Sequence, residues 1–587
     1  MSTFIGRAKI LPFPADRQRL FGWFASLTVW AISTTMGSVQ AAESVKIGFG
    51  SFEYGVSLKD LEAYAKPAAV SKDKSTKPAL SSLPQSGYSL NVKDSKYLQQ
   101  ILTLRWDFKP RQVSQFFHSA VGEKMLVYLG DLVETGGNRD RWAAPLVNRN
   151  LNAVTALRTG LVAAAADRRG LSLLTFVRKY PAPTMRLNLE RGFEVANKID
   201  ALGKETQAAL SSVERLSSEL ARSEPKIEPK AMATLGSPGQ YPVKLQPEIL
   251  NDVRRKRRFN VDFYLPQGLS QAAPVIVFSH GLASDRQHFA VTARHLASHG
   301  FVAVTVEHPG SNTQKFKSLL GGTSKEIFDV SEFIDRPKDV SYVLDDLDRR
   351  FPGLANVQQS GAIGHSFGGY TALALAGATI DFDYLTQQCS QGTNATNASL
   401  LLQCEALKLP RQSDNFRDPR IKFALAISPV DSSIFGPKGM AKIQIPVAIA
   451  AASEDVVASP VLEQVKPFSW LVAPERYLIV VRGVGHVADA RSLVRAFMPS
   501  LQSLIPDQNI EPLREYARIF ILALVQTHVA DRSTYRAYLQ AGYARAVSKS
   551  PNQLSILRTL TPTQFATFRL ENRSQSQLQT NRAKIGP

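Results

Sequence analysis

Gly364-His365-Ser366-Phe367-Gly368-Gly369 lies where a short apolar strand, ending in Ala362-Ile363, is followed by an alanine-rich helix that begins near Tyr370. Glycines on both sides of a serine permit a tight turn that lifts the hydroxyl above the edge of a sheet. The helix that follows points its free N–H groups toward that hydroxyl. The combination of strand, Gly-x-Ser-x-Gly and helix predicts a nucleophile elbow with Ser366 as its serine.

Around this elbow, apolar runs rich in β-branched residues alternate with amphipathic helical stretches. The expected strands are 258–265, 274–279, 301–307, 361–364, 421–428, 446–451 and 476–481. Several of them are almost entirely apolar, which is typical of parallel strands covered on both faces. The sequence therefore predicts an α/β fold with a doubly wound, mostly parallel sheet, and functional groups at the carboxyl ends of its strands.

The N-terminus carries the features of an export signal. Arg17 and Arg19 precede an apolar stretch at 20–32, and Val39-Gln40-Ala41 forms a small-residue cleavage site. This pattern predicts a cleavable signal peptide at 1–41 and a secreted or periplasmic protein. A membrane anchor is the alternative, but the apolar stretch is too short to span a bilayer easily.

The rest of the chain divides into segments that differ in the spacing of their apolar residues. Residues 43–222 are expected to form a mainly helical N-terminal domain, and Met185, Leu189, Phe193, Ala196, Ile199 and Leu202 recur at spacings typical of a core-facing helix. Residues 223–242, with several Pro, Gly and Lys, are the expected linker. The catalytic domain follows at 243–545 and a C-terminal tail at 546–587. The apolar run at 517–525 is short and suggests a buried helix.

The charge of the chain bears on its partners. The formal net charge is +20, and loss of residues 1–41, with four basic and one acidic side chain, leaves about +17. An exported basic protein is more suited to anionic lipid or cell-wall surfaces than to nucleic acid, which is not an expected partner. The cluster Arg254-Arg255-Lys256-Arg257-Arg258 is expected to be a solvated strand edge, with binding to an anionic membrane surface as the alternative.

The chain has two cysteines, Cys389 and Cys404, 15 positions apart. An oxidising compartment favours a disulfide between them, and free buried cysteines are the alternative. The bridge would close an excursion rich in Ser, Asn and Gln.

A serine hydroxyl becomes a useful nucleophile when an imidazole takes its proton and a carboxylate orients that imidazole. In a fold with a nucleophile elbow, the three catalytic residues follow one another along the chain in the order serine, acid, histidine. Of nine histidines, only His486 and His528 follow Ser366. His486 lies in a glycine-bracketed loop directly after the last predicted strand, whereas His528 lies within a helical stretch. The order therefore predicts His486 as the base.

Two carboxyl groups compete for the role of the acid. Asp455 follows the strand at 446–451, which is the usual place, and is favoured. Asp431 follows the preceding strand and stays open as the alternative, and Glu454 is a weaker third candidate. The oxyanion of a tetrahedral intermediate needs two N–H donors. We expect these to be the amides of Phe367 and of Leu282, where Gly281 lets the loop turn inward.

These motifs resemble the α/β-hydrolase superfamily over roughly residues 258–490. The nearest branch comprises platelet-activating factor acetylhydrolases and dienelactone-hydrolase-like esterases. The segments that carry the resemblance are Ser279-His280-Gly281-Leu282, Leu296-Ala297-Ser298-His299-Gly300-Phe301, Val306-Glu307-His308, the elbow and Gly485-His486. The N-terminal segment is similar to helical domains that precede such hydrolases in cyanobacteria-like sequences.

The resemblance implies a serine hydrolase that cleaves carboxylic esters, including short acyl chains on phospholipids, with no metal and no cofactor. Its substrate would be a small-molecule ester or a lipid. The acetylhydrolase pattern would assign the acid to Asp431, whereas the broader superfamily assigns it to Asp455. A second function class stays open, since a fold does not fix a function: a non-catalytic binding or scaffold protein on a hydrolase fold.

Overall fold

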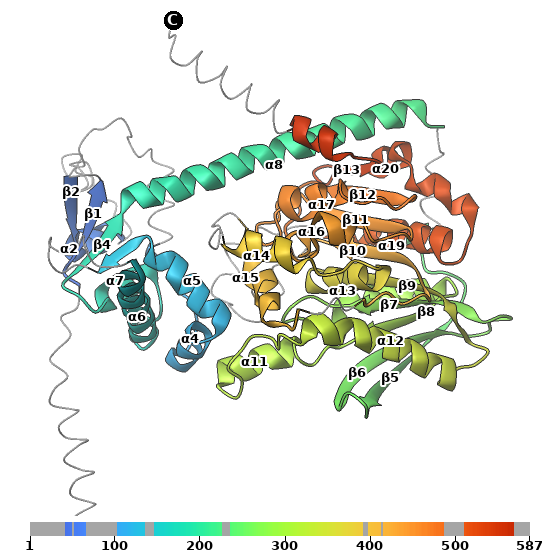
Figure 1. The fold of residues 1–587 in the computed structure, drawn as a ribbon, viewed down its shortest axis with the longest axis horizontal. Coiled ribbons are helices and arrows are strands. Elements are labelled where there is room, and N and C mark those ends of the chain that lie inside the picture. Colours follow the sequence, from blue (N-terminus) through green and yellow to red (C-terminus); the bar gives the residue numbers. More distant parts are fainter. Residues whose placement is uncertain are drawn as a thin grey trace, which may run out of the picture.

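The computed structural model describes residues 42–49, 52–65, 102–135, 146–225, 235–390, 397–411, 415–486 and 510–568. The predicted signal peptide at 1–41 and residues 226–234 of the expected linker lie outside these ranges. Two sheets organise the described residues, a small one near the N-terminus and a large one that follows it (Figure 1).

The large sheet has nine strands in the order β13-β12-β11-β10-β9-β7-β8-β6-β5. The strands are β5 (Val243–Asp252), β6 (Arg257–Pro266), β7 (Ala273–Ser279), β8 (Val302–Val306), β9 (Ala355–His365), β10 (Ile421–Ile427), β11 (Val447–Ala452), β12 (Arg476–Val481) and β13 (Leu554–Leu557). The six strands from β12 to β8 are parallel, and the antiparallel strands lie at the two edges. The predicted mostly parallel α/β sheet is confirmed.

Helices cover both faces of this sheet and enclose two separate cores. On β7, Val275 and Val277 face one core, whereas Ile276 and Phe278 face the other, as alternation along a strand requires. The first core is completed by α12 (Glu332–Arg350), α13 (Phe367–Ala376) and α16 (Ser432–Met440), and the second by α10 (Ala290–Ser298), α19 (Glu511–His528) and α20 (Ala541–Val547). Strands with apolar side chains on both faces need this double cover.

Shorter elements complete this part of the chain. They are η3 (Arg286–Phe289), α11 (Thr313–Gly321), α14 (Phe382–Ser390), α15 (Leu400–Gln403), η4 (Cys404–Lys408), η5 (Pro460–Val465), α17 (Lys466–Phe468) and η7 (Ser533–Leu539).

The N-terminal unit combines helices with a four-stranded sheet of order β2-β1-β4-β3. Its elements are β1 (Ser44–Phe49), β2 (Phe52–Ser57), α2 (Leu58–Ala65), α4 (Pro110–Phe117), α5 (Ala120–Gly130), β3 (Val133–Thr135), α6 (Leu146–Ala165), α7 (Leu173–Lys179), β4 (Thr184–Asn188) and α8 (Leu189–Ser223). A separate apolar core holds them together, with Leu126 and Tyr180 fully buried.

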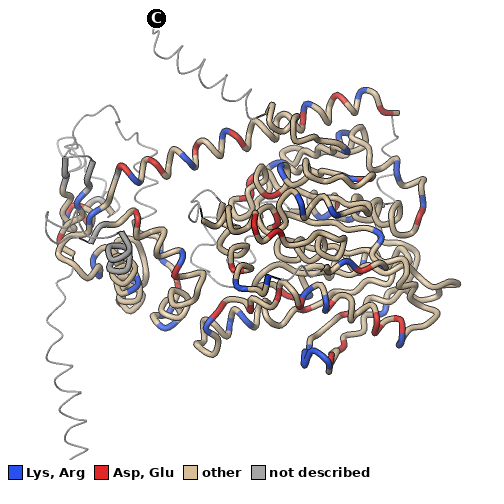
Figure 2. Tube along the Cα trace, in the orientation of Figure 1, with Lys and Arg blue, Asp and Glu red and all other residues tan. Residues whose placement is uncertain are grey.

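Helix α8 joins the two units. It leaves the small sheet and runs to the far edge of the large one, where it packs on β13 and α20 (Figure 1). There the Ser217 hydroxyl accepts a hydrogen bond from the Ile556 amide at 3.0 Å. Acidic and basic residues alternate along the helix (Figure 2), and pairs such as Lys198 with Glu194 stabilise its first half, which is largely exposed.

Two expectations for this region were wrong. Met185 lies in β4 and not in a helix, and Phe193 and Ile199 are 50% and 52% exposed. Their spacing is helical, but the first half of α8 has no core to face, and the fully buried residues of the helix, Leu210 and Val213, lie in its second half. The sheet also continues past the expected domain boundary at 545, because the backbone of β13 pairs antiparallel with β12 and its side chains are buried.

The apolar run at 517–525 lies in α19, whose middle is buried in the second core, as expected. Within the described ranges, no helix combines the length and the apolar character that a bilayer span requires.

Candidate active site

Ser366 occupies the turn between β9 and α13, at the centre of the large sheet. Its φ of 56° and ψ of −116° are strained for a residue with a side chain. The flanking glycines explain how the turn closes. A Cβ on Gly364 would lie 1.9 Å from the Gly368 carbonyl oxygen, and a Cβ on Gly368 would lie 1.9 Å from the Ser279 carbonyl oxygen. Only glycine fits at either position.

The structure brings Ser366, His486 and Asp455 together. The Ser366 Oγ lies 3.0 Å from His486 Nε2, and His486 Nδ1 lies 2.7 Å from Asp455 Oδ2. The other carboxylate oxygen, Oδ1, accepts hydrogen bonds from the amides of Val457 at 2.9 Å and Ala458 at 2.7 Å. These bonds hold the carboxylate in one orientation, and a carboxylate acceptor keeps the imidazole proton on Nδ1. The free lone pair on Nε2 then faces the serine hydroxyl.

The loop that carries His486 is held at its base. The Arg482 side chain pairs with Glu214 of α8 and donates to Gln207 at 2.9 Å, so the N-terminal unit contacts this loop directly. The Gly483 amide donates to the Ser453 hydroxyl at 2.9 Å. This last bond ties the histidine loop to the loop that carries Asp455.

Asp431 and Glu454 do not reach the imidazole. Glu454 is exposed. Asp431 is fully buried, and neither of its carboxyl oxygens has a hydrogen-bond partner in the part of the chain that the structure describes. Burial, together with the neighbouring Glu463, raises the pKa of Asp431 well above its usual value. Glu463 itself accepts the amides of Asp431 and Ser432 at 3.0 and 2.9 Å.

His365, the residue before the serine, makes contacts at the site that were not predicted from the sequence. Its Nε2 donates to the His486 carbonyl at 2.7 Å, and its ring stacks on His288 with 5.0 Å between centroids. Burial lowers the pKa of both His365 and His288, which favours neutral rings. The only sequence signal for this role was the position of His365 inside the elbow motif.

The two predicted oxyanion donors lie beside the serine. A Cβ on Gly281 would lie 3.4 Å from the Ser366 Cβ, so the loop that carries Leu282 passes close to the hydroxyl. Within the described residues, neither the Leu282 amide nor the Phe367 amide has a backbone acceptor. The Phe367 amide is also the first of α13, where helix geometry leaves N–H groups unpaired.

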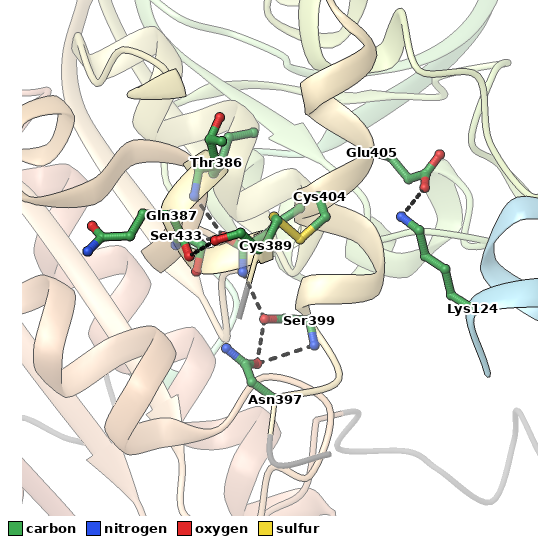
Figure 3. Close-up of a disulfide and its surroundings, with 12 residues drawn as sticks. Lys124, Thr386, Gln387, Cys389, Asn397, Ser399, Cys404, Glu405 and Ser433 are labelled. Carbon is green, nitrogen blue, oxygen red and sulfur yellow. Dashed lines mark hydrogen bonds and ion pairs between the residues drawn. A yellow bond between two sulfur atoms is a disulfide. The ribbon is translucent and has the colours of Figure 1, made fainter. Parts of the chain in front are cut away.

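The predicted disulfide is present. Cys389, at the end of α14, and Cys404, at the start of η4, are bonded with 5.8 Å between their Cα atoms. Next to the bridge, Lys124 of α5 forms an ion pair with Glu405 (Figure 3). The disulfide excursion therefore meets the N-terminal unit at a charged contact.

The basic cluster at 254–258 is not a simple solvated edge. Arg255 and Arg257 have side chains only 19% and 12% exposed, and both donate to Asp339. Arg257 also pairs with Glu332. The expectation that the cluster is solvated was wrong for these two residues, because acidic side chains from β5 and α12 face them. The four acidic residues are Asp252, Glu332, Asp335 and Asp339.

Among the described residues, no three His, Cys, Asp or Glu side chains are arranged to hold a metal ion.

Comparisons with known proteins match two parts of the chain. A family model described as an alpha/beta hydrolase of unknown function (DUF1400) matches residues 41–188. A second model, platelet-activating factor acetylhydrolase, isoform II, matches residues 254–318, which include the loop of Leu282. A search of curated proteins finds no match.

The fold, the elbow and the two matches define a hydrolase. The fold is that of an α/β-hydrolase, and the match over residues 254–318 supports the acetylhydrolase-like branch.

Proposed function

We propose that this hydrolase is an exported serine esterase that cleaves carboxylic esters through an acyl-enzyme. The observation that carries the proposal is the unbroken line of contacts from the Ser366 Oγ through the His486 ring to Asp455. All three groups follow strands of one parallel sheet, where carboxyl ends meet at one edge.

In the acylation step, the Ser366 Oγ attacks the ester carbonyl carbon while His486 Nε2 takes the hydroxyl proton. The carbonyl electron pair moves onto oxygen, where the amides of Leu282 and Phe367 donate to it. Collapse of this intermediate breaks the bond to the leaving alkoxide, which receives the proton from Nε2. Asp455 stabilises the imidazolium throughout and keeps it oriented.

Deacylation repeats these events with water as the nucleophile. His486 Nε2 takes a proton from water, the acyl carbon forms a second tetrahedral intermediate, and the Ser366 Oγ leaves with the returned proton. The neutral rings of His365 and His288 add no positive charge beside His486. This leaves His486 as the group that exchanges protons.

The similarity to acetylhydrolases supports small esters or lipid esters with short acyl chains as the substrate class. The predicted signal peptide and the disulfide support export to an oxidising compartment. An anionic membrane surface is the proposed site of lipid substrates, on the basis of the net charge of the chain.

A fluorophosphonate probe and a panel of p-nitrophenyl esters with graded acyl lengths test the proposal. We expect the mature protein to be labelled at Ser366 and to hydrolyse short acyl esters fastest. The variant Ser366→Ala should lose labelling and turnover, while Ser428→Ala, also buried beside a strand end, should keep both. A wild-type protein without labelling and turnover would favour the non-catalytic binding role instead.

A further inference from the structure

Arg336 of α12 is the bulkiest fully buried side chain in the described part of the molecule. A guanidinium without water is costly unless its donors are paired. Here Nη1 donates to the His280 carbonyl at 2.7 Å, and Nε and Nη2 donate to the Ser311 hydroxyl at 3.0 and 2.8 Å. Glu332, 3.4 Å from Nε, balances the charge.

The contacts of Arg336 extend to the two backbone segments that lie beside Ser366. His280 lies two residues before Leu282, in the loop that carries one candidate oxyanion donor. The guanidinium carbon Cζ lies over the Phe367 ring, 4.2 Å from the ring centroid. Phe367 supplies the other candidate donor. One side chain therefore bridges the two backbone segments whose spacing sets the width of the oxyanion site.

The helix that carries Arg336 is itself tied to the elbow. Pro337 has no N–H, so the carbonyl of Phe333 one turn earlier lacks its helical partner. The Tyr370 hydroxyl donates to that carbonyl at 2.8 Å. Because Tyr370 lies in the first turn of α13, this bond holds Arg336 in a fixed position relative to Ser366.

A second set of bonds fixes the loop from behind. Asp339, which accepts from Arg257, lies 2.9 Å from His308 Nδ1, and His308 Nε2 lies 2.9 Å from the Ser279 hydroxyl. The His308 amide donates to His280 Nε2 at 3.0 Å. Burial lowers the pKa of Arg336 to about 10, so its side chain remains cationic at neutral pH.

We propose that Arg336 is a positioning residue that holds the Leu282 and Phe367 amides at the spacing the oxyanion requires. This inference rests on the proposed esterase function. Oxyanion donors act through preorganisation. A shift of about 0.5 Å in one segment therefore reduces the stabilisation of the transition state more than it reduces the affinity for the substrate. Arg336 should therefore affect kcat with little effect on KM.

The test compares Arg336→Met and Arg336→Lys with Arg349→Met, a matched change at a 64%-exposed arginine of the same helix. We expect kcat for a p-nitrophenyl ester to fall about 10- to 100-fold in Arg336→Met, with KM within about twofold. Arg336→Lys should recover part of the loss, and Arg349→Met should match the wild type. A trifluoromethyl ketone, which the serine converts to a tetrahedral oxyanion, should bind more weakly by the same factor as kcat/KM falls.

A milder variant tests the same role if Arg336→Met does not fold. Ser311→Ala keeps the charge and removes the oxygen to which two guanidinium nitrogens donate, and it should lower kcat about 3- to 10-fold with KM unchanged. Wild-type kcat in folded Arg336→Met, or in Ser311→Ala if the former does not fold, would overturn the positioning role alone. Absence of labelling and turnover in the wild type would overturn the proposed function and this inference together.

Discussion

Asp455→Asn is the substitution whose consequence the structure specifies most closely. Within the described residues, the Asp455 Oδ1 accepts two backbone amides, whereas Oδ2 meets only His486 Nδ1. An asparagine at this position should keep its carbonyl oxygen toward the two amides. The reverse orientation would set its NH₂ against these two N–H groups and leave the buried Ala458 amide without an acceptor, at a cost of about 1–3 kcal/mol.

The NH₂ of the asparagine would then face His486 Nδ1 and require it to act as an acceptor. The imidazole proton moves to Nε2, which can no longer take the proton of Ser366. We expect kcat to fall by about 10⁴, the size seen when the triad acid of a serine protease is replaced in this way. This loss corresponds to about 5 kcal/mol of transition-state stabilisation. Steady-state hydrolysis of a p-nitrophenyl ester at pH 7 measures it.

Asp431→Asn is the matched control, because it makes the same change at the competing carboxyl group. The Asp431 oxygens have no partner within the described residues, so kcat should stay within about twofold of the wild type. Since burial raises the pKa of Asp431, the folded protein binds this proton more tightly than the unfolded chain. The wild type therefore loses stability as pH rises above about 4, and Asp431→Asn should flatten that slope.

The reasoning would be refuted if Asp431→Asn lost activity while Asp455→Asn kept it. Near-wild-type kcat in both variants would also contradict it, since the imidazole would then need no orienting carboxylate.

Three further predictions concern stability. Replacing Cys389 and Cys404 by serine should lower the free energy of unfolding by about 3 kcal/mol in denaturant titrations, and an unchanged midpoint would contradict a stabilising bridge. Burial lowers the pKa of His528 to about 4, so its contribution to stability is lost as pH falls from about 6.5 toward 4. Melting curves of His528→Gln should therefore depend less on pH in that window, and an identical slope would argue against a buried neutral ring. Gly368→Ala should cost about 3 kcal/mol or more, because the new Cβ meets a carbonyl oxygen at 1.9 Å, whereas Gly203→Ala, in open space on α8, should raise the melting temperature slightly.

Much of the fold followed from local patterns. The apolar runs predicted seven of the strands of the large sheet, and the glycines around Ser366 predicted the elbow, because both depend on spacings of a few residues. The edge strands β5 and β13 were missed. Strand β5 is exposed or half-buried at most positions and has no near-continuous apolar run, whereas β13 is buried throughout but is only four residues long.

Long-range contacts account for the other differences. The helical spacing of Phe193 and Ile199 suggested a buried face, but which segment lies beside a helix is not encoded in its own periodicity. In the same way, the charge of Arg255 and Arg257 suggested solvation, and only the folded chain brings α12 with its acidic side chains against them.

The sequence by itself predicted the central strands of the sheet, the elbow serine, the histidine that it meets and the cysteine pair, because motif, chain order and count leave few alternatives for each. Only the tertiary structure decided which carboxyl group meets the His486 ring, because Asp431 and Asp455 each follow a parallel strand and differ in the path of the loop afterwards. It alone also revealed Arg336 between the two segments beside Ser366. Distances of about 3 Å between residues far apart in the sequence arise from packing, which no local pattern specifies.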